Sequence, residues 1–293
     1  MISALKEMAL PSISRRTLIR FLPTIVLVII SLIALSLLEF ASLEPVAPSP
    51  TKQHKHKTGN RHKNMAAAGN NTLKFLTIPP RALHTATIIF SHGLGDTGDG
   101  WKPVARELAS ALPHAKWILP HAPMRPITVN YGMVMNGWSD VYSLGKIDAK
   151  EDEEGLLQSA AAIKELVKAE NDAGISNNRI VLGGFSQGAA LSVLTGLTTE
   201  PKYAGIAVLS GWFPIRQQLQ KILNPNAAST PIFWGHGTDD QLVPHDLGVR
   251  SVQLLQESLQ FKDVVFKSYT GVAHSADEQE IDDLSEWLAK VIP

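Results

Sequence analysis

The sequence predicts an α/β fold in which helices cover both faces of one mostly parallel central sheet. From residue 73 to the C-terminus, short apolar runs of strand length alternate with longer stretches of helix length. Clusters of Gly, Pro and Asp separate these segments, as is usual at turns. Strands that alternate with helices indicate a parallel sheet. The chain has 293 residues, 44% of them hydrophobic, which suits one large globular domain with an appendage.

The appendage comprises the first 72 residues, which fall into three parts. Residues 1–20 form a basic N-terminal segment, and residues 21–38 are uncharged and almost wholly apolar. As a helix, residues 21–38 are just long enough to cross a hydrocarbon layer about 30 Å thick. We therefore predict a transmembrane signal anchor and membrane association through this segment. Residues 39–72 are rich in Pro, His and Lys, cannot bury a core, and are predicted to be a disordered linker.

Two alternatives stay open for the appendage. The apolar stretch at residues 21–38 is also compatible with a buried core helix. In addition, Met65 is a second candidate start of translation. A protein that begins there lacks residues 1–64 and is expected in the cytoplasm.

Charge and cysteine content exclude several classes of protein. The 27 basic and 27 acidic residues give a formal net charge of zero, so the sequence provides no electrostatic basis for binding nucleic acid. The chain has no cysteine, which excludes disulfides, thiolate metal sites, a cysteine nucleophile and S-palmitoylation of the protein itself.

The elements of the predicted catalytic domain, residues 73–293, follow from apolar runs and from helical spacing. Strands are predicted at residues 73–78, 87–91, 116–119, 179–182, 205–209, 231–234 and 264–268. Helices are predicted at residues 102–112, 154–173, 187–197, 246–259 and 278–291. Functional sites of such sheets lie at the carboxyl ends of the parallel strands.

The fourth predicted strand leads into a G-x-S-x-G pattern. Residues 180–182 are apolar like a strand buried on both faces, residues 184–188 read GFSQG, and helical spacing follows. A strand, a sharp turn and a helix in this order are typical of a nucleophile elbow, with Ser186 as the nucleophile. The glycines at positions 184 and 188 fit this turn, because a Cβ at either place would collide with the neighbouring strand or helix. An ordinary glycine-rich turn is the alternative.

Partners for this serine are predicted at the ends of three other strands. Leu94, between two glycines after the second strand, is expected to donate its backbone N–H to an oxyanion, together with the N–H of Gln187. His274 follows the last strand and is the predicted base. Asp239 and Asp240 are adjacent acids after the preceding strand, and the chemistry alone leaves the choice between them open. The order Ser, Asp, His along the chain is that of α/β-hydrolases.

The stretch from residue 121 to residue 146 is too long and too apolar for a plain connection. We interpret it as part of an acyl-chain groove, lined by Met133, Val134 and Trp138 together with Trp212. A loop that is packed for its own stability is the alternative. Four consecutive acids at residues 151–154 precede a predicted helix, where acids favour the helix dipole.

Distinctive stretches occur at residues 92–98 with Trp101, 120–123, 183–188, 209–212, 236–237 with Asp240 and 242–244, and 274–275. Together they resemble the acyl-protein thioesterase/lysophospholipase family of serine α/β-hydrolases over roughly residues 73–293. The resemblance selects Asp240 over Asp239 and implies no cofactor and no metal. Members of this family are cytosolic enzymes, and the resemblance implies the same substrates for this chain. One class of substrate is S-acylated, membrane-associated proteins, including G-protein α subunits, from which palmitate is removed. The other class is lysophospholipids. The family does not generally carry a membrane-spanning segment.

The function expected from these residues is hydrolysis through an acyl-serine intermediate. His274 takes the proton from Ser186, Asp240 holds the imidazole, and two backbone N–H groups stabilise the oxyanion. A carboxylesterase or lysophospholipase acting on small lipid esters is the alternative within enzymes. A non-catalytic acyl-binding scaffold is the alternative from another class, and the intact set of three side chains argues against it.

Overall fold

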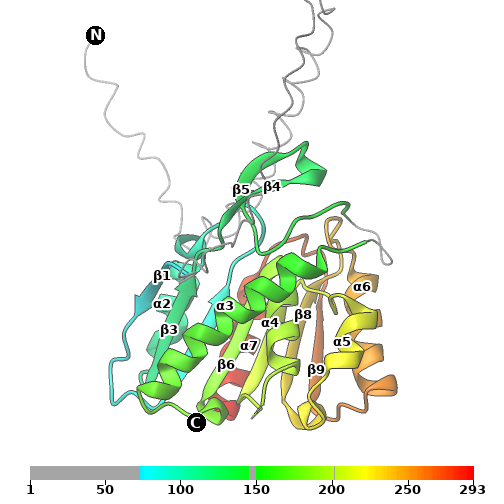
Figure 1. The fold of residues 1–293 in the computed structure, drawn as a ribbon. Helices are drawn as coiled ribbons and strands as arrows, with labels where there is room; N and C mark the ends of the chain where they lie inside the picture. The colour runs from blue at the N-terminus through cyan, green and yellow to red at the C-terminus, as the bar shows by residue number, and fades with distance from the viewer. Residues whose placement is uncertain (1–72, 145–149, 201) are drawn as a thin grey trace, which may run out of the picture. The chain divides into compact units, whose positions relative to one another are not determined.

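A computed structural model describes residues 73–144, 150–200 and 202–293. In this part of the chain, a seven-stranded sheet has the order β1-β3-β2-β6-β7-β8-β9 (Figure 1). Only β1 is antiparallel to its neighbour, β3; the other neighbours are parallel. The strands are β1 (Phe75–Ile78), β2 (Ala86–Ser91), β3 (Ala115–Pro120), β6 (Ile180–Phe185), β7 (Gly205–Leu209), β8 (Ile232–Gly237) and β9 (Val264–Tyr269).

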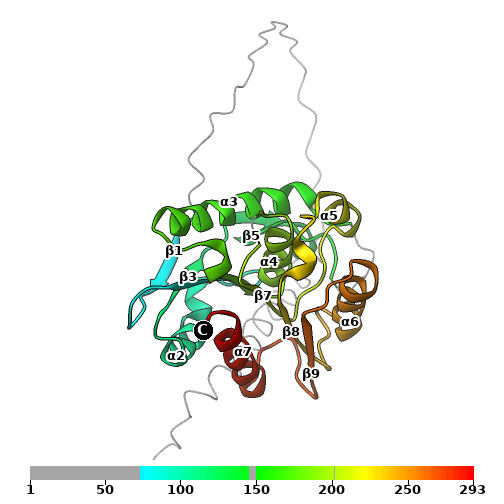
Figure 2. The same ribbon diagram turned by 90° about the horizontal axis from the view of Figure 1, so that it is seen from below.

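Helices cover both faces of the sheet. Figure 2 shows α3, α4 and α5 on one face and α2 and α7 on the other. The helices are α2 (Gly98–Ala111), α3 (Glu153–Asp172), α4 (Gln187–Leu197), α5 (Arg216–Ile222), α6 (His245–Gln253) and α7 (Glu278–Val291), with 3₁₀ turns at Thr128–Asn130, Asn177–Arg179 and Ala227–Ser229. The helix predicted at residues 246–259 is divided, because α6 continues as a π-helix at Leu254–Ser258.

Side chains that cap helix N-termini fix where three of the helices begin. The side chains of Thr97, Asp152 and Asp277 accept hydrogen bonds from backbone N–H groups in the first turns of α2, α3 and α7. These N–H groups have no partner within their own helix, so each cap stabilises its helix by about 1 kcal/mol. Two of the four acids at residues 151–154, Glu153 and Glu154, lie in the first turn of α3, as the dipole argument predicts.

The sheet is buried as an α/β architecture requires. Every residue of β2, β6, β7 and β8 is buried, and so is every residue of α4, which packs against β6 and β7. Strands buried on both faces explain the continuous apolar runs in the sequence. The predicted α/β-hydrolase fold is confirmed.

The strand register aligns the loops that carry the predicted site residues. Ser91 at the end of β2 pairs with Gly184 near the end of β6, and Gly237 at the end of β8 pairs with Tyr269 at the end of β9. The chain therefore leaves neighbouring strands at nearly the same level. This places the loops after β2, β6, β8 and β9 at one edge of the sheet.

The predicted long loop at residues 121–146 contains a hairpin that the sequence reading missed. Strands β4 (Met124–Ile127) and β5 (Met133–Asn136) pair with each other in a separate two-stranded sheet. Figure 1 shows this hairpin standing above the central sheet. Pro126 lies inside β4, and a proline normally argues against a strand, so the pattern resembled a loop. The short helix α5 was missed as well.

The prediction of a transmembrane helix is corrected by the structure. Within residues 73–144, 150–200 and 202–293, no helix combines the length and the apolar character needed to cross a membrane. The stretch at residues 21–38, on which the prediction rested, lies outside the described residues, as do the rest of the appendage and Met65.

Candidate active site

Ser186 stands at the turn between β6 and α4 in a strained backbone conformation. Its φ is 55° and its ψ is −120°, a region that residues other than glycine rarely adopt. The N–H of Ser186 donates to the carbonyl of Leu209 at 2.9 Å, which ties the turn to the end of β7. A Cβ on Gly184 would lie 2.4 Å from the carbonyl of Gly188, and one on Gly188 would lie 2.1 Å from the carbonyl of Ser91. Both glycines are therefore required for the sharp turn, as predicted.

The three side chains predicted from distant parts of the sequence form one hydrogen-bonded chain. His274 Nε2 lies 2.9 Å from Ser186 Oγ, and His274 Nδ1 lies 2.7 Å from Asp240 Oδ2. Both distances are within the normal range of hydrogen bonds. Ser186 is 9% exposed and Asp240 is 6% exposed, so the chain lies just below the surface.

The carboxylate of Asp240 is held in its charged form. Burial by itself raises the pKa of this group, but hydrogen bonds with His236 and His274 and with the N–H of Val243 outweigh it and lower the pKa below its ordinary value. Oδ1 accepts the N–H groups of Leu242 and Val243, each at 2.9 Å, so Oδ2 is left to face His274.

Asp239 was the other candidate for the acid that contacts His274, but its side chain points elsewhere. It is exposed, and its Oδ1 accepts a hydrogen bond from the hydroxyl of Thr238 at 2.8 Å. Adjacent side chains point in different directions in this turn, so only one of the two acids reaches His274. The geometry brings Asp240, not Asp239, to the imidazole.

Backbone segments that carry the two predicted oxyanion donors lie beside Ser186. A Cβ on Gly93 would lie 3.4 Å from the Cβ of Ser186, which shows how closely the loop after β2 approaches the serine. Leu94 is the next residue of that loop. Gln187 is the first residue of α4, and N–H groups in the first turn of a helix have no partner within the helix. The donor roles of Leu94 and Gln187 stay predictions.

His92 joins the loop after β2 to the loop after β3. Its Nδ1 donates to the carbonyl of Gly93 at 2.7 Å, and its Nε2 accepts the N–H of Ala122 at 3.0 Å. Burial lowers the pKa of His92 to about 4, which keeps the ring neutral. This residue is therefore structural, which agrees with the absence of a second base in the predicted mechanism.

The family model described as phospholipase/carboxylesterase matches residues 73–292, nearly all of the described part. The chain belongs to the phospholipase/carboxylesterase family. It is 47% identical over 234 residues to the acyl-protein thioesterase 1 of Cryptococcus neoformans var. neoformans serotype D, with 75% of this chain and 98% of that protein covered. It is 44% identical over 217 residues to the acyl-protein thioesterase 1 of Yarrowia lipolytica, with 73% and 96% covered.

Solved structures with a similar fold include two plant proteins, each 32% identical to this chain. The Zea mays acyl-protein thioesterase 2 superposes with a TM-score of 0.67 over 75% of this chain and all of that chain. Arabidopsis thaliana SOBER1 superposes with a TM-score of 0.68 over 71% of this chain and all of that chain. Together with the family model, these proteins confirm the predicted family and the prediction of a hydrolase enzyme.

The four residues predicted to line an acyl groove in this family member are not gathered into one open surface. Met133 and Val134, on β5, are 41% and 57% exposed. Trp138 is fully buried; its backbone N–H donates to Gln187 Oε1 at 2.8 Å and its indole N–H to the carbonyl of His92 at 2.8 Å. The prediction that Trp138 lines the groove is therefore wrong, since a side chain without exposed surface does not line an open groove; its hydrogen bonds instead connect it to Gln187 and His92. Trp212 is half-buried.

Glu151 has a structural role that was not predicted from the sequence. Its carboxylate accepts the indole N–H of Trp212 at 2.8 Å and the backbone N–H of Ile215. Ile215 has φ 36°, which is strained for a β-branched side chain. Burial raises the pKa of Glu151, although both hydrogen bonds oppose the change. Because acids are common before a helix, nothing in the sequence distinguished Glu151 from Asp152, which caps α3 by accepting the N–H of Gly155.

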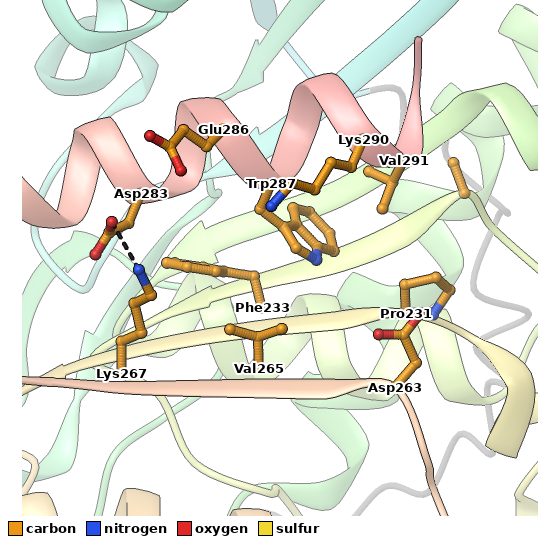
Figure 3. Close-up of a pocket in the computed structure, with 11 residues that line it drawn as sticks. Pro231, Phe233, Asp263, Val265, Lys267, Asp283, Glu286, Trp287, Lys290 and Val291 are labelled. Carbon is orange, nitrogen blue, oxygen red and sulfur yellow. Dashed lines mark ion pairs between the residues drawn. The ribbon is translucent and has the colours of Figure 1, made fainter.

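A hollow of about 380 Å³ lies elsewhere, between α7 and the strands β8 and β9 (Figure 3). An ion pair of 2.7 Å between Lys267 and Asp283 borders it. None of the predicted site residues lines it, so it offers no acyl groove to Ser186. Its lining comprises Ala204, Pro231, Phe233, Asp263, Val265, Lys267, Asp283, Glu286, Trp287, Lys290 and Val291.

Proposed function

We propose that this enzyme is a serine hydrolase that removes fatty acyl groups, palmitoyl among them, from S-acylated cysteines of proteins. The observation that carries the proposal is the continuous chain of contacts from Ser186 Oγ through His274 to Asp240, at 2.9 and 2.7 Å. The names of the relatives, acyl-protein thioesterase 1 and 2, support acylated proteins or lipids as the substrate class.

Acylation of the enzyme begins with Ser186. The hydroxyl donates its proton to His274 Nε2 while Oγ attacks the carbonyl carbon of the thioester. Asp240 remains charged and accepts a hydrogen bond from His274 Nδ1, so it stabilises the imidazolium that forms. The backbone N–H groups of Leu94 and Gln187 hold the oxyanion. The carbon–sulfur bond then breaks, His274 returns the proton to the leaving thiolate, and an acyl-serine remains.

Deacylation repeats the same steps with water. His274 takes a proton from a water molecule that attacks the acyl carbonyl, and the proton passes to Ser186 Oγ as the ester bond breaks. The products are a free fatty acid and the original enzyme. Thiolates leave more readily than alkoxides, so one site can cleave thioesters and oxygen esters. Hydrolysis of small lipid esters such as lysophospholipids is therefore the second candidate function, and the family description as phospholipase/carboxylesterase supports it.

A substrate panel tests the proposal. Wild type and Ser186→Ala are compared on a palmitoyl-cysteine peptide, a lysophospholipid and a short p-nitrophenyl ester, and each protein is treated with a fluorophosphonate probe. We expect wild type to give the highest kcat/KM on the palmitoyl peptide. Ser186→Ala is expected to lose turnover of all three substrates and to lose labelling. Persistent labelling of Ser186→Ala would refute the nucleophile, and a higher kcat/KM for lysophospholipid would favour the second function.

Ser110→Ala is a suitable control for the loss of a hydroxyl. Ser110 is exposed on α2, and its hydroxyl only reaches the carbonyl of Arg106 in the same helix. This variant is expected to retain wild-type turnover and labelling.

We further propose membrane-associated S-palmitoylated proteins, such as G-protein α subunits, as natural substrates. Incubation of a palmitoylated Gα subunit with wild type should release palmitate, whereas Ser186→Ala should release none. The location of the enzyme stays a prediction: cytoplasmic if translation starts at Met65. The intact mass of the native protein from cells tells whether residues 1–64 are present.

A further inference from the structure

A second histidine stands directly behind the Asp240 carboxylate. His236 lies near the end of β8, is fully buried, and takes no part in the chain from Ser186 to Asp240. Its Nε2 lies 2.9 Å from the carbonyl of Val243 and 3.5 Å from Asp240 Oδ2. A carbonyl oxygen only accepts hydrogen bonds, so Nε2 carries the proton. The same N–H group therefore donates to Val243 and faces the carboxylate.

Val243 connects this histidine to the carboxylate a second time. Its N–H donates to Asp240 Oδ1 at 2.9 Å, while its carbonyl accepts from His236 Nε2. Two hydrogen bonds through Val243, and the 3.5 Å contact between His236 Nε2 and Asp240 Oδ2, thus connect the strand, the carboxylate and the turn from residue 240 to residue 243. If the contact to His236 is lost, the turn is free to shift, and Oδ2 shifts with it.

The Nδ1 side of the His236 imidazole is fixed by packing. A Cβ on Gly248, in α6, would lie 2.4 Å from His236 Nδ1, so the ring fills the space that the glycine leaves. Nδ1 has no hydrogen-bond partner among the described residues. With Nε2 bound to a carbonyl and Nδ1 against an α-carbon, the ring is locked in the tautomer that has its proton on Nε2.

In the described part of the chain, few ionisable groups face His236 from the elements around it. Asp240 lies on its own turn, and His245 of α6 stands edge-on at 5.6 Å between ring centroids, with its Nε2 2.8 Å from the hydroxyl of Ser268. Glu280 of α7 lies on the opposite face of β8, where it meets Gly235. Asp240 is thus the acid that the N–H of His236 faces.

We propose that His236 is a positioning residue for the hydrolytic reaction, which keeps Asp240 oriented toward His274. The inference rests on the proposed function. It assigns no contact with substrate to His236. Its effect is on the chemical step, because the orientation of His274 matters most when its ring becomes charged. A displacement of a catalytic group by about 1 Å costs up to roughly 10²-fold in rate.

Two amide variants separate the hydrogen bond from the space that the ring fills. The amide nitrogen of His236→Gln reaches the place of Nε2, whereas that of His236→Asn ends about one bond short, near the place of Nδ1. We expect His236→Gln to retain most of the wild-type kcat on a short thioester. His236→Asn is expected to lose roughly 10- to 10²-fold in kcat with KM changed less than about twofold.

His114→Asn is the matched control. His114 Nε2 also lies 2.8 Å from a backbone carbonyl, that of Ile292, far along the chain from the predicted site. We expect this variant to retain wild-type kcat and KM. Ser186→Ala is measured alongside: turnover that survives in Ser186→Ala contradicts the proposed function. If Ser186→Ala is inactive while His236→Asn matches wild type, only the role of His236 is overturned.

A spectroscopic measurement reports the same contact without turnover. The proton on His274 Nδ1 faces Asp240 Oδ2 at 2.7 Å, and we expect it to give a far-downfield proton NMR resonance in wild type. It should persist in His236→Gln and shift or broaden in His236→Asn. Equal losses of kcat in the Gln and Asn variants, an unchanged resonance in both, or loss of folding in both by thermal unfolding would show that His236 only fills space, and each would overturn the proposal.

Discussion

Two buried carboxyl groups flank the end of β8, and their surroundings differ completely. Asp240, in the turn after the strand, accepts backbone N–H groups and faces His274. Glu280, in the first turn of α7, is 0% exposed, and neither of its carboxyl oxygens has a hydrogen-bond partner among the described residues. Its Oε1 would lie only 2.2 Å from a Cβ on Gly235.

The same burial therefore has opposite consequences for the two acids. Hydrogen bonds with His236 and His274 outweigh burial at Asp240 and lower its pKa. At Glu280, burial and the nearby charge of Asp277 raise the pKa well above its ordinary value, which favours the neutral form of the carboxyl group. Local donors, rather than depth in the protein, determine which acid is able to stabilise an imidazolium.

The largest expected effect is on catalysis at the charged acid. Asp240→Asn removes the charge that holds the His274 imidazolium, and we expect kcat on a palmitoyl-cysteine peptide to fall by about 10⁴-fold. Asp239→Asn is the matched control, because Asp239 is adjacent in sequence but exposed. It should retain wild-type kcat. Similar losses in both variants would contradict the assignment of Asp240.

The next effect concerns the space that Glu280 occupies. Gly235→Ala places a methyl group on the Glu280 carboxyl group, and we expect it to lower the free energy of unfolding by about 1–3 kcal/mol in urea denaturation. In a Glu280→Ala background, the same change should cost clearly less, because the colliding atoms are gone. Strictly additive effects in this double-mutant cycle would show that Gly235 and Glu280 do not meet.

A pH series distinguishes the two acids by sign. A carboxyl group with a raised pKa binds its proton more tightly in the folded state, so its contribution to stability is present below the unfolded pKa of 4.5 and is lost as pH rises. A lowered pKa, as at Asp240, gives the reverse: its contribution is present above 3.8 and is lost as pH falls.

Glu280→Gln should therefore gain stability relative to wild type as pH rises above about 4.5, with a slope of at most about 1.4 kcal/mol per pH unit for one proton. The measurement is the free energy of unfolding in urea at several pH values. Glutamine also leaves a buried amide, which adds a constant offset, so the pH dependence is the informative quantity. A difference from wild type that is constant between pH 4.5 and 8 would contradict a neutral Glu280.

The smallest effect on stability is expected at Glu151, which is partly buried and accepts hydrogen bonds as Asp240 does. Burial raises its pKa, but Trp212 and Ile215 both donate to its carboxylate. Glu151→Gln retains an oxygen that accepts one of these donors. We expect its stability relative to wild type to rise with pH, as for Glu280→Gln, but by less. A steeper rise than that of Glu280→Gln would show that the two donors do not offset burial.

The sequence was most informative where the polypeptide has few alternatives. The elbow at Ser186 needs glycines on both sides, and the apolar runs of β6, β7 and β8 are those of strands buried on both faces. Parallel pairing then brings the loops after these strands to one edge. The convergence of Ser186, Asp240 and His274 follows from order along the chain and could be predicted before any distance was known.

Other features depend on tertiary contacts that leave no pattern in the sequence. The β4–β5 hairpin contains Pro126, and among the described residues its strands pair only with each other, so the stretch looked like a loop. Trp138 was expected in a groove because it is large and apolar, yet its two N–H groups find acceptors in the interior. Likewise, residues distant in sequence determine whether the carboxyl group of Glu280 meets a hydrogen-bond donor.

The central claim is that Ser186 carries the acyl group during turnover. The most direct measurement is mass spectrometry of enzyme quenched in acid during the first turnover of a palmitoyl-cysteine peptide, followed by mapping of the modified peptide. We predict one palmitoyl adduct, on Ser186 of the wild-type enzyme, which is absent from Ser186→Ala. An adduct on another residue, or wild-type turnover by Ser186→Ala, would contradict the account.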